Sequence, residues 1–446
     1  MAKDGERPHP CYGVFPEHPL NELSVLPQGI ELPGPGYIGR VHASAIRIDT
    51  LPVVLVAAVL ALVCVAAVPW AWDRWRHRVA GRVGTTVLAV LMVVAGSGLA
   101  VNSVGSFYPT LGSLLGTSPN PEEGTVADAG PDGRDLDRTL SAVGGRAAGN
   151  HGSLLHLTVT GRRTGITRDV DVYLPAVYAA PDWAGFRFPV LEWIPHFPGE
   201  PRQVATLYGL PDLLDQQIAS HRLPPTVVIV PDPNGEPRLT HDSECIDAVG
   251  GDADDTYLSA DLRSWALSRL RVRSDREGWA AAGWSSGGYC ALNLTVRHPQ
   301  WFSVAVSMSG YDTTPQDVET GDLFHGRADI RHANDVSATL REHPAPVRLL
   351  VCADGAAGDE RAALDRLRAA AAPPVELTTW LLPPAGHNLN AVRAELPAVL
   401  GWLDAQLGQP VDGTGPPGQV TPGVVPPWPL PDTGDPGSLH GTDTAT

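Results

Sequence analysis

The sequence is poor in lysine and in cysteine. Lys3 is the only lysine among 446 residues, and the formal net charge is −17. A nucleic-acid partner is therefore not expected, because binding phosphates requires clustered lysine and arginine. The H-E-x-x-H, paired C-x-x-C and P-loop patterns are also missing from the sequence, so we predict neither a metal nor a cofactor. Asp252, Asp254 and Asp255 lack the other ligands of a calcium loop, and we interpret them as a solvated turn.

Charge is also absent from two long apolar runs near the start of the chain. Residues 51–72 and residues 83–104 each form an uncharged stretch of 22 residues. A helix of about 20 apolar residues can cross a bilayer. Two such runs separated by only ten residues are rare as core helices of soluble domains, and the first begins too late for a cleaved signal peptide. The sequence therefore predicts two transmembrane helices.

The ten-residue connection between these runs predicts their orientation. It carries four arginines and one acidic residue, Asp73. The arginines are Arg74, Arg76, Arg78 and Arg82. Positive charge beside a span marks the cytoplasmic side, so both termini are expected outside. Residues 1–50 are then an extracytoplasmic segment with little patterned structure, and everything after the second span faces the cell exterior.

Composition divides the rest of the chain into three parts. Residues 107–150 are rich in glycine, proline, serine and aspartate, which is typical of an extended linker. Residues 151–407 alternate buried apolar strands with helical patterns, beginning with a hairpin. This alternation predicts an α/β fold, a mostly parallel sheet with helices on both faces. Residues 408–446 are dense in proline and glycine, and we expect this tail to be disordered.

The stretch "WAAAGWSSGGYC" holds the strongest chemical signal. Residues 283–287 fit G-x-S-x-G with Ser285 at the centre, after an apolar strand and before a helix. A nucleophile on such a sharp turn is exposed at the sheet edge, and small flanking residues leave room for neighbouring backbone. The pattern predicts Ser285 as nucleophile. It also predicts that the backbone N–H of Ser286, at the start of the helix, donates to an oxyanion.

A serine nucleophile needs a base and an orienting acid, which follow it in the chain order serine, acid, histidine. His387 lies in a loop after the strand "VELTTWLL" and before the last helix, and we predict it as the base. The acid should follow the strand "VRLLVCA". Asp354, at the end of this strand, is the preferred residue; Asp359 is the alternative, and Glu360 is a third possibility.

The block from Leu154 to Leu407 resembles the α/β-hydrolase superfamily, within its esterase D and antigen 85 mycolyltransferase-like group. The matching stretches are "FPVLEWIPHFPG", "ECIDAVGG", "GWSSGGYCALNLTVRHPQWFSVAVSMSGY" and "AGH". Many actinobacterial members of this group are similar to this chain in carrying several N-terminal membrane spans. The resemblance implies an α/β-hydrolase fold that acts on esters without a cofactor.

The turn that supplies the second oxyanion donor departs from this group. Relatives usually have His-Gly before "YPG" or "FPG", whereas this chain has Pro195-His196. Glycine lets an N–H approach the substrate carbonyl closely. Its replacement therefore puts the oxyanion hole in doubt or shifts the donor to Phe197. Losing one donor typically costs about 10²–10³ in rate.

The "EC" and "GGYCA" cysteines tend to occur together in the resembling group, which implies a Cys245–Cys290 disulfide in an oxidising compartment. Two free buried thiols are the alternative. The whole pattern predicts a membrane-anchored extracytoplasmic serine esterase or acyltransferase acting on a lipid or cell-envelope ester. The resemblance offers a mycolyl-type acyltransferase and a hydrolase of aminoacylated phospholipid. A catalytically inactive hydrolase fold used as an envelope-binding or scaffold protein is the rival hypothesis.

Overall fold

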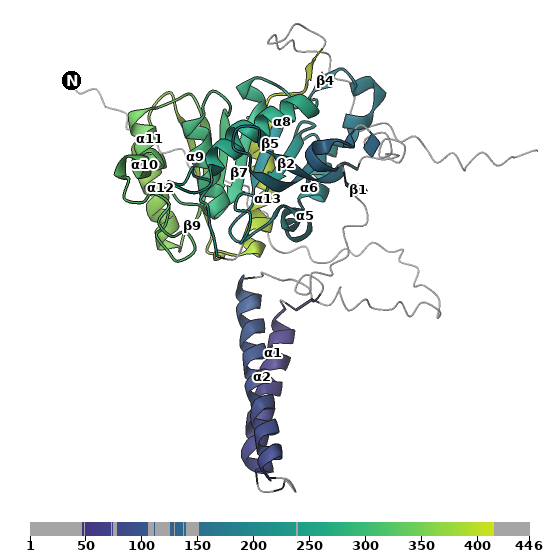
Figure 1. Cartoon of the computed structure of the whole chain (residues 1–446), viewed down its shortest axis with the longest axis vertical. Helices are drawn as coiled ribbons and strands as arrows, with labels where there is room; N and C mark the ends of the chain where they lie inside the picture. The colour runs from purple at the N-terminus through teal and green to yellow at the C-terminus, as the bar shows by residue number, and fades with distance from the viewer. Residues whose placement is uncertain are drawn as a thin grey trace, which may run out of the picture. The chain divides into compact units, whose positions relative to one another are not determined.

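The structure is a computed structural model of the whole chain (Figure 1). It describes residues 47–48, 50–72, 74, 78–105, 111, 125–128, 130–136, 138–139, 151–237 and 240–413. The predictions for residues 1–46 and 414–446 fall outside these ranges, apart from the boundary of the tail considered below.

Two apolar helices stand where the sequence predicts membrane spans. Helix α1 (Leu51–Ala71) and helix α2 (Arg78–Gly105) lie side by side, and a Cβ built on Gly96 would lie 3.7 Å from the Ala57 carbonyl oxygen (Figure 1). Both are long and apolar enough to cross a membrane. Most of their large apolar side chains are exposed, as lipid-facing side chains would be. Length, composition and exposure are thus compatible with spanning helices.

A nine-stranded sheet organises the larger part of the described chain. Its strand order is β1-β2-β3-β6-β5-β7-β8-β9-β10. Strand β3 runs antiparallel to both of its neighbours, β2 and β6, and every other pair of neighbours is parallel. The strands are β1 (Thr125–Asp128), β2 (Ser153–Thr160), β3 (Thr167–Leu174), β5 (Val190–Ile194), β6 (Val227–Pro231), β7 (Trp279–Trp284), β8 (Val304–Met308), β9 (Arg348–Asp354) and β10 (Glu376–Leu382). The predicted mostly parallel α/β architecture is confirmed.

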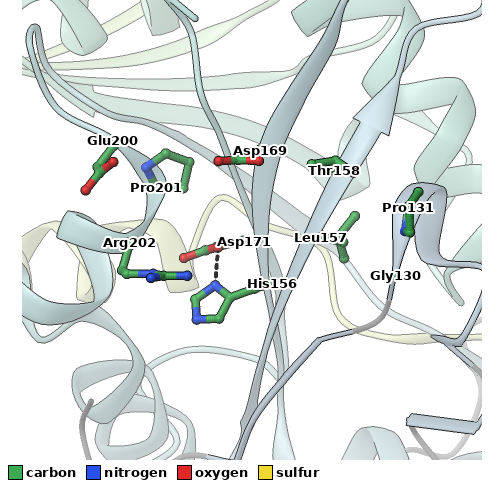
Figure 2. A pocket seen from close by; sticks show the side chains of 10 residues that line it. All are labelled: Gly130, Pro131, His156, Leu157, Thr158, Asp169, Asp171, Glu200, Pro201 and Arg202. Atoms are coloured by element: carbon green, nitrogen blue, oxygen red, sulfur yellow. Dashed lines mark hydrogen bonds and ion pairs between the residues drawn. The ribbon is translucent and has the colours of Figure 1, made fainter. Parts of the chain in front are cut away.

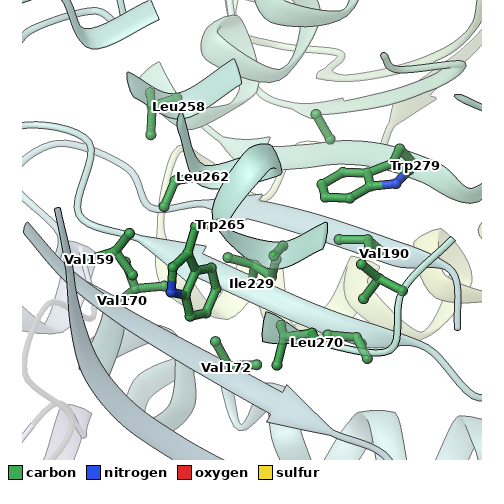
Figure 3. Close-up of a cluster of buried hydrophobic side chains, with 14 of the residues drawn as sticks. Val159, Val170, Val172, Val190, Ile229, Leu258, Leu262, Trp265, Leu270 and Trp279 are labelled. Atoms are coloured by element: carbon green, nitrogen blue, oxygen red, sulfur yellow. The ribbon is translucent and has the colours of Figure 1, made fainter. Parts of the chain in front are cut away.

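Helices cover both faces of this sheet, because its central strands are apolar on both sides. One face carries α5 (Pro201–Tyr208), α6 (Leu210–Ala219) and α13 (Leu389–Asp404). The other carries α8 (Leu262–Arg269), α9 (Ser286–Arg297), α11 (Val336–Glu342) and α12 (Gly358–Ala370). Figure 3 shows Leu262 and Trp265 of α8 over Val170 and Ile229 of the sheet, all within one buried cluster.

The remaining short elements connect these layers. Helices α7 (Asp254–Thr256) and α10 (Ala328–Ala333) are single-turn or short α-helices, and residues Tyr257–Asp261 (η5) form a π-helix that leads into α8. The 3-10 turns are η2 (Pro131–Gly133), η3 (Ala176–Ala179), η4 (Pro181–Trp183) and η6 (Arg276–Gly278). Helices α10 and α11 lie in the insert between β8 and β9, for which the sequence shows no pattern.

Two of the predicted domain boundaries are wrong. The predicted tail at 408–446 begins too early, because strand β11 (Val411–Asp412) pairs antiparallel with strand β4 (Phe186–Arg187). The guanidinium of Arg273 also binds the Gln409 carbonyl at 2.8 Å. At the other end, the predicted linker 107–150 contains strand β1 and the buried Leu136. Both segments are held by backbone pairing and by hydrogen bonds from distant residues, which composition does not reveal.

The segment between β5 and β6 forms two helices. Its sequence pattern from about residue 203 to 220 predicts one continuous helix, yet α5 ends and α6 begins at Gly209, whose φ is 64°. This left-handed conformation suits glycine and ends an α-helix.

Candidate active site

Ser285 lies on a sharp turn between strand β7 and helix α9. Its φ of 58° and ψ of −125° fall where residues other than glycine are rarely found. The turn is anchored by the Ser285 N–H, which donates to the Met308 carbonyl at 2.9 Å. A Cβ on Gly283 would lie 2.3 Å from the Gly287 carbonyl oxygen, and a Cβ on Gly287 would lie 2.2 Å from that of Ile194. Only glycine therefore fits at either position, which is why this turn needs the G-x-S-x-G pattern.

The imidazole of His387 joins this serine to a carboxylate. His387 lies in the loop between β10 and α13. Its Nε2 is 2.9 Å from Ser285 Oγ, and its Nδ1 is 3.0 Å from Glu360 Oε1. The ring stacks on Trp284 with 4.9 Å between centroids, and the side chain is 43% exposed. The geometry places a base within reach of the serine and an acid on the other ring nitrogen, accessible from solvent.

The structure corrects the choice of acid. Glu360, in the first turn of α12, holds His387, whereas Asp354 and its alternative Asp359 were favoured from the sequence. The Asp354 carboxylate is buried at the end of β9 and accepts three backbone N–H groups instead. The donors are Ala356 at 2.7 Å, Ala385 at 2.9 Å and Gly386 at 2.7 Å. Asp359 is exposed on the same helix turn.

Both buried carboxylates are held in the ionised form. Burial pushes the pKa of Glu360 upward, but hydrogen bonds from His387, the Asp354 N–H and Ser309 outweigh it and lower the pKa. The Asp354 pKa is lowered first by the Ala356 N–H and then by the two N–H groups beside His387. Asp354 thus anchors the loop that carries the histidine, and Glu360 contacts the imidazole itself.

The two predicted oxyanion donors lie next to each other, but only one is free. The N–H of Ser286 opens helix α9, where the first N–H groups have no helical carbonyl to bind. The N–H of Phe197 donates instead to the Ser286 hydroxyl oxygen, at 2.7 Å. Phe197 therefore lies beside the residue that follows Ser285, with its N–H already engaged.

His196, of the Pro195-His196 turn, packs inside this loop. Its Nδ1 lies 2.7 Å from the Tyr208 hydroxyl, and its ring lies 4.6 Å from that of Trp284. Burial, and then the nearby His387, lower the pKa of His196 to about 4, so it is neutral near pH 7. Trp284 lies between the two imidazoles, in contact with each. The G-x-S-x-G motif does not predict that Trp284 contacts both imidazoles, because Trp284 occupies its variable second position.

A disulfide joins Cys245 to Cys290, with 5.6 Å between their Cα atoms. It ties the loop of "HDSECIDAVGG" to helix α9, directly behind the nucleophile. Among the described residues Cys64 and Cys352 are free thiols, while Cys11 lies outside the described part of the chain.

The acidic run near residue 252 contacts arginine and histidine side chains. Asp254 pairs with Arg168 at 2.6 Å, and Asp252 with the same guanidinium at 3.2 Å. Asp255 is buried against His298, at 2.5 Å. Within the ranges that the structure describes, no group of three histidine, cysteine or acidic side chains could hold a metal ion. The interpretation as a solvated turn is wrong for Asp254 and Asp255, which are 1% and 2% exposed.

A polar pocket of about 400 Å³ lies apart from the serine. Figure 2 shows His156 of β2 paired with Asp171 of β3, with Arg202 of α5 beside this pair. Neither Ser285 nor His387 lines it. The pocket is therefore not the space in which the serine would meet a substrate.

Comparison with known proteins gives a family match and several similar proteins. Residues 161–363 match the family described as "Putative esterase". An uncharacterized protein of Corynebacterium glutamicum is 29% identical over 243 residues, which cover 52% of this chain and 53% of that protein. The MPT51 antigen of Mycobacterium leprae is 44% identical over 57 residues, covering 13% of this chain and 18% of the antigen. The chain thus spans about half the length of the first relative and less of the second.

Among solved structures, a ferulic acid esterase superposes with a TM-score of 0.50 at 18% sequence identity. The superposition covers 58% of this chain and 100% of the esterase. At this identity the likeness establishes the fold. The sheet order and the serine turn between β7 and α9 agree with the α/β-hydrolase fold, and the match over residues 161–363 is to a family of esterases.

Proposed function

We propose that this chain is a serine esterase or acyltransferase whose catalytic groups are Ser285, His387 and Glu360. The observation that carries the proposal is the continuous line of contacts from the Ser285 hydroxyl through both nitrogens of His387 to the Glu360 carboxylate. A positioned base and an ionised acid are what a serine hydroxyl needs to become nucleophilic near neutral pH.

Catalysis proceeds in two acyl-transfer steps. The Ser285 hydroxyl gives its proton to His387 Nε2 as its oxygen attacks the ester carbonyl carbon, and the carbonyl oxygen becomes an oxyanion. His387 returns the proton to the departing alcohol, leaving an acyl-serine. Water, or the hydroxyl of an acceptor molecule, then loses its proton to His387 and attacks the acyl-serine, which restores Ser285. Glu360 remains ionised throughout and stabilises the imidazolium.

Labelling with a fluorophosphonate tests this proposal. The full chain is expected to react covalently, and Ser285→Ala is expected to abolish labelling while thermal unfolding stays unchanged. A folded wild-type protein without Ser285-dependent labelling would disprove the proposal. That result would favour the inactive scaffold, for which the occupied Phe197 N–H is the supporting observation.

We further propose that the two apolar helices anchor the enzyme in the cell membrane with its catalytic domain outside. The arginine-rich connection between them supports this orientation, and so does a disulfide, which persists in oxidising compartments. An enzyme held at a membrane surface meets lipids and envelope components. We therefore propose a lipid or cell-envelope ester as substrate.

A further inference from the structure

The side chain of Ser286 occupies the donor that an oxyanion would use. The Phe197 N–H donates to Ser286 Oγ at 2.7 Å, and Ser286 is 6% exposed. A single N–H cannot bind this hydroxyl and a carbonyl oxygen at full strength at the same time. In the free enzyme one of the two oxyanion donors is therefore satisfied from within the protein.

Both partners of this hydrogen bond are fixed in place by their surroundings. The Phe197 loop is held through His196, which binds the Tyr208 hydroxyl and packs on Trp284. Ser286 is the first residue of helix α9, and the next residue is pressed against the Ile194 carbonyl so closely that only glycine fits. The backbone cannot easily separate the two groups, but a serine hydroxyl can rotate between staggered positions about its Cα–Cβ bond.

We propose that the Ser286 hydroxyl is an internal competitor for the oxyanion hole. In the resting state it satisfies the Phe197 N–H. On acylation the hydroxyl rotates away, and the developing oxyanion takes its place on the same N–H, beside the N–H of Ser286. This inference rests on the proposed esterase activity and adds a residue that restrains it.

The restraint is expected to be modest, because one neutral hydrogen bond is exchanged for another. The net contribution of such a bond corresponds to roughly a 2- to 10-fold change in rate. Removing the hydroxyl should therefore speed acylation by about this factor. If the hydroxyl instead donated its proton to the oxyanion, its removal would slow the reaction by about 10²–10³.

Ser286→Ala and Ser286→Thr provide the test, with the full chain and 4-nitrophenyl acetate as substrate. Alanine removes the competing oxygen, so kcat/KM should rise roughly 2- to 10-fold. Threonine keeps the hydroxyl and should give no gain. A trifluoromethyl ketone, whose adduct with Ser285 carries an oxyanion, should bind more tightly to Ser286→Ala by a similar factor. A merely structural effect on the helix would not produce that selective gain.

The results separate this inference from the esterase proposal. Suppose that the wild type labels normally and the folded Ser286→Ala protein has unchanged or lower kcat/KM. The proposal that the Ser286 hydroxyl competes for the oxyanion hole is then wrong, and the esterase proposal remains. A gain with threonine equal to that with alanine also overturns the proposed competition. Fluorophosphonate labelling absent from both wild type and Ser286→Ala removes the two proposals together.

Discussion

At the scale of single residues, Asp354 at the end of β9 and Glu360 in the first turn of α12 have different tasks. Glu360 binds the imidazole of His387, and Asp354 binds the backbone just before that histidine. They also touch each other, since the Asp354 N–H donates to Glu360 Oε2 at 2.8 Å. One group orients the base directly, while the other fixes the loop on which it stands.

Replacing Glu360 by glutamine should lower kcat by about 10²–10⁴ with little change in KM, because the imidazolium loses its stabilising charge. Steady-state hydrolysis of 4-nitrophenyl acetate measures this loss. Asp359→Asn is the matched control, an exposed acid one residue away, and should keep wild-type activity. A full loss in Asp359→Asn with an active Glu360→Gln protein would instead favour Asp359, the alternative acid expected from the sequence.

Asp354→Asn should destabilise the protein by roughly 1–3 kcal/mol, because the amide keeps only one accepting oxygen and its NH2 group would face an N–H donor on the other side. The Asp354 pKa is lowered in the folded state, so its contribution is fully present above the unfolded pKa of about 4. It is lost as the pH falls through the lower folded pKa. Urea unfolding at pH 7 and pH 3 should show the difference between wild type and variant shrinking in acid. A difference that stays constant would show that the ionised carboxylate does not matter.

At the scale of elements, the site is built where β7 turns into α9 and is tied down from behind by the disulfide. The two cysteines are separated by 45 residues. Closing such a loop is expected to stabilise the fold by about 2–4 kcal/mol, mainly by restricting the unfolded chain. The bond thus supports the helix whose first turn carries the oxyanion donor.

Cys245→Ala with Cys290→Ala should lower the denaturant midpoint while leaving kcat close to that of the wild type near 25 °C. The reason is that the bond constrains the unfolded chain and touches no proposed catalytic group. Unfolding of the wild type with and without dithiothreitol should reproduce the shift. If reduction had no effect on the wild type, the disulfide would not contribute to stability.

At the scale of the whole molecule, the orientation of the two proposed spans would decide on which side of the membrane the enzyme works. An alkaline phosphatase fusion after Thr446 should be active, because that enzyme needs an oxidising compartment, as the Cys245–Cys290 bond does. A fusion into the arginine-rich connection around residues 74–78 should be inactive. The reverse pattern would overturn both the orientation and the proposed envelope substrate. Fusion at the end of the chain avoids β11, which belongs to the folded domain.

Local and periodic features of the sequence determined most of the architecture. Apolar runs of bilayer length predicted α1 and α2, and alternation of apolar strands with helices predicted the sheet. The serine turn was also predictable from local sequence. Its strained backbone requires glycine at positions 283 and 287, so a stretch of five residues is enough to identify it. His387 followed from its place after a strand.

Contacts between distant residues were decided only by the tertiary structure. Asp354 and Glu360 stand six residues apart and both suit an acid after the strand, but only loop closure at the sheet edge determines which reaches His387. The Ser286 hydroxyl meets Phe197 across 89 residues of chain, and β11 meets β4 across more than two hundred. Sequence patterns report the local preferences of the backbone and the burial of side chains. A hydrogen bond of about 3 Å between two loops forms only where the packing of the whole domain brings its donor and acceptor together.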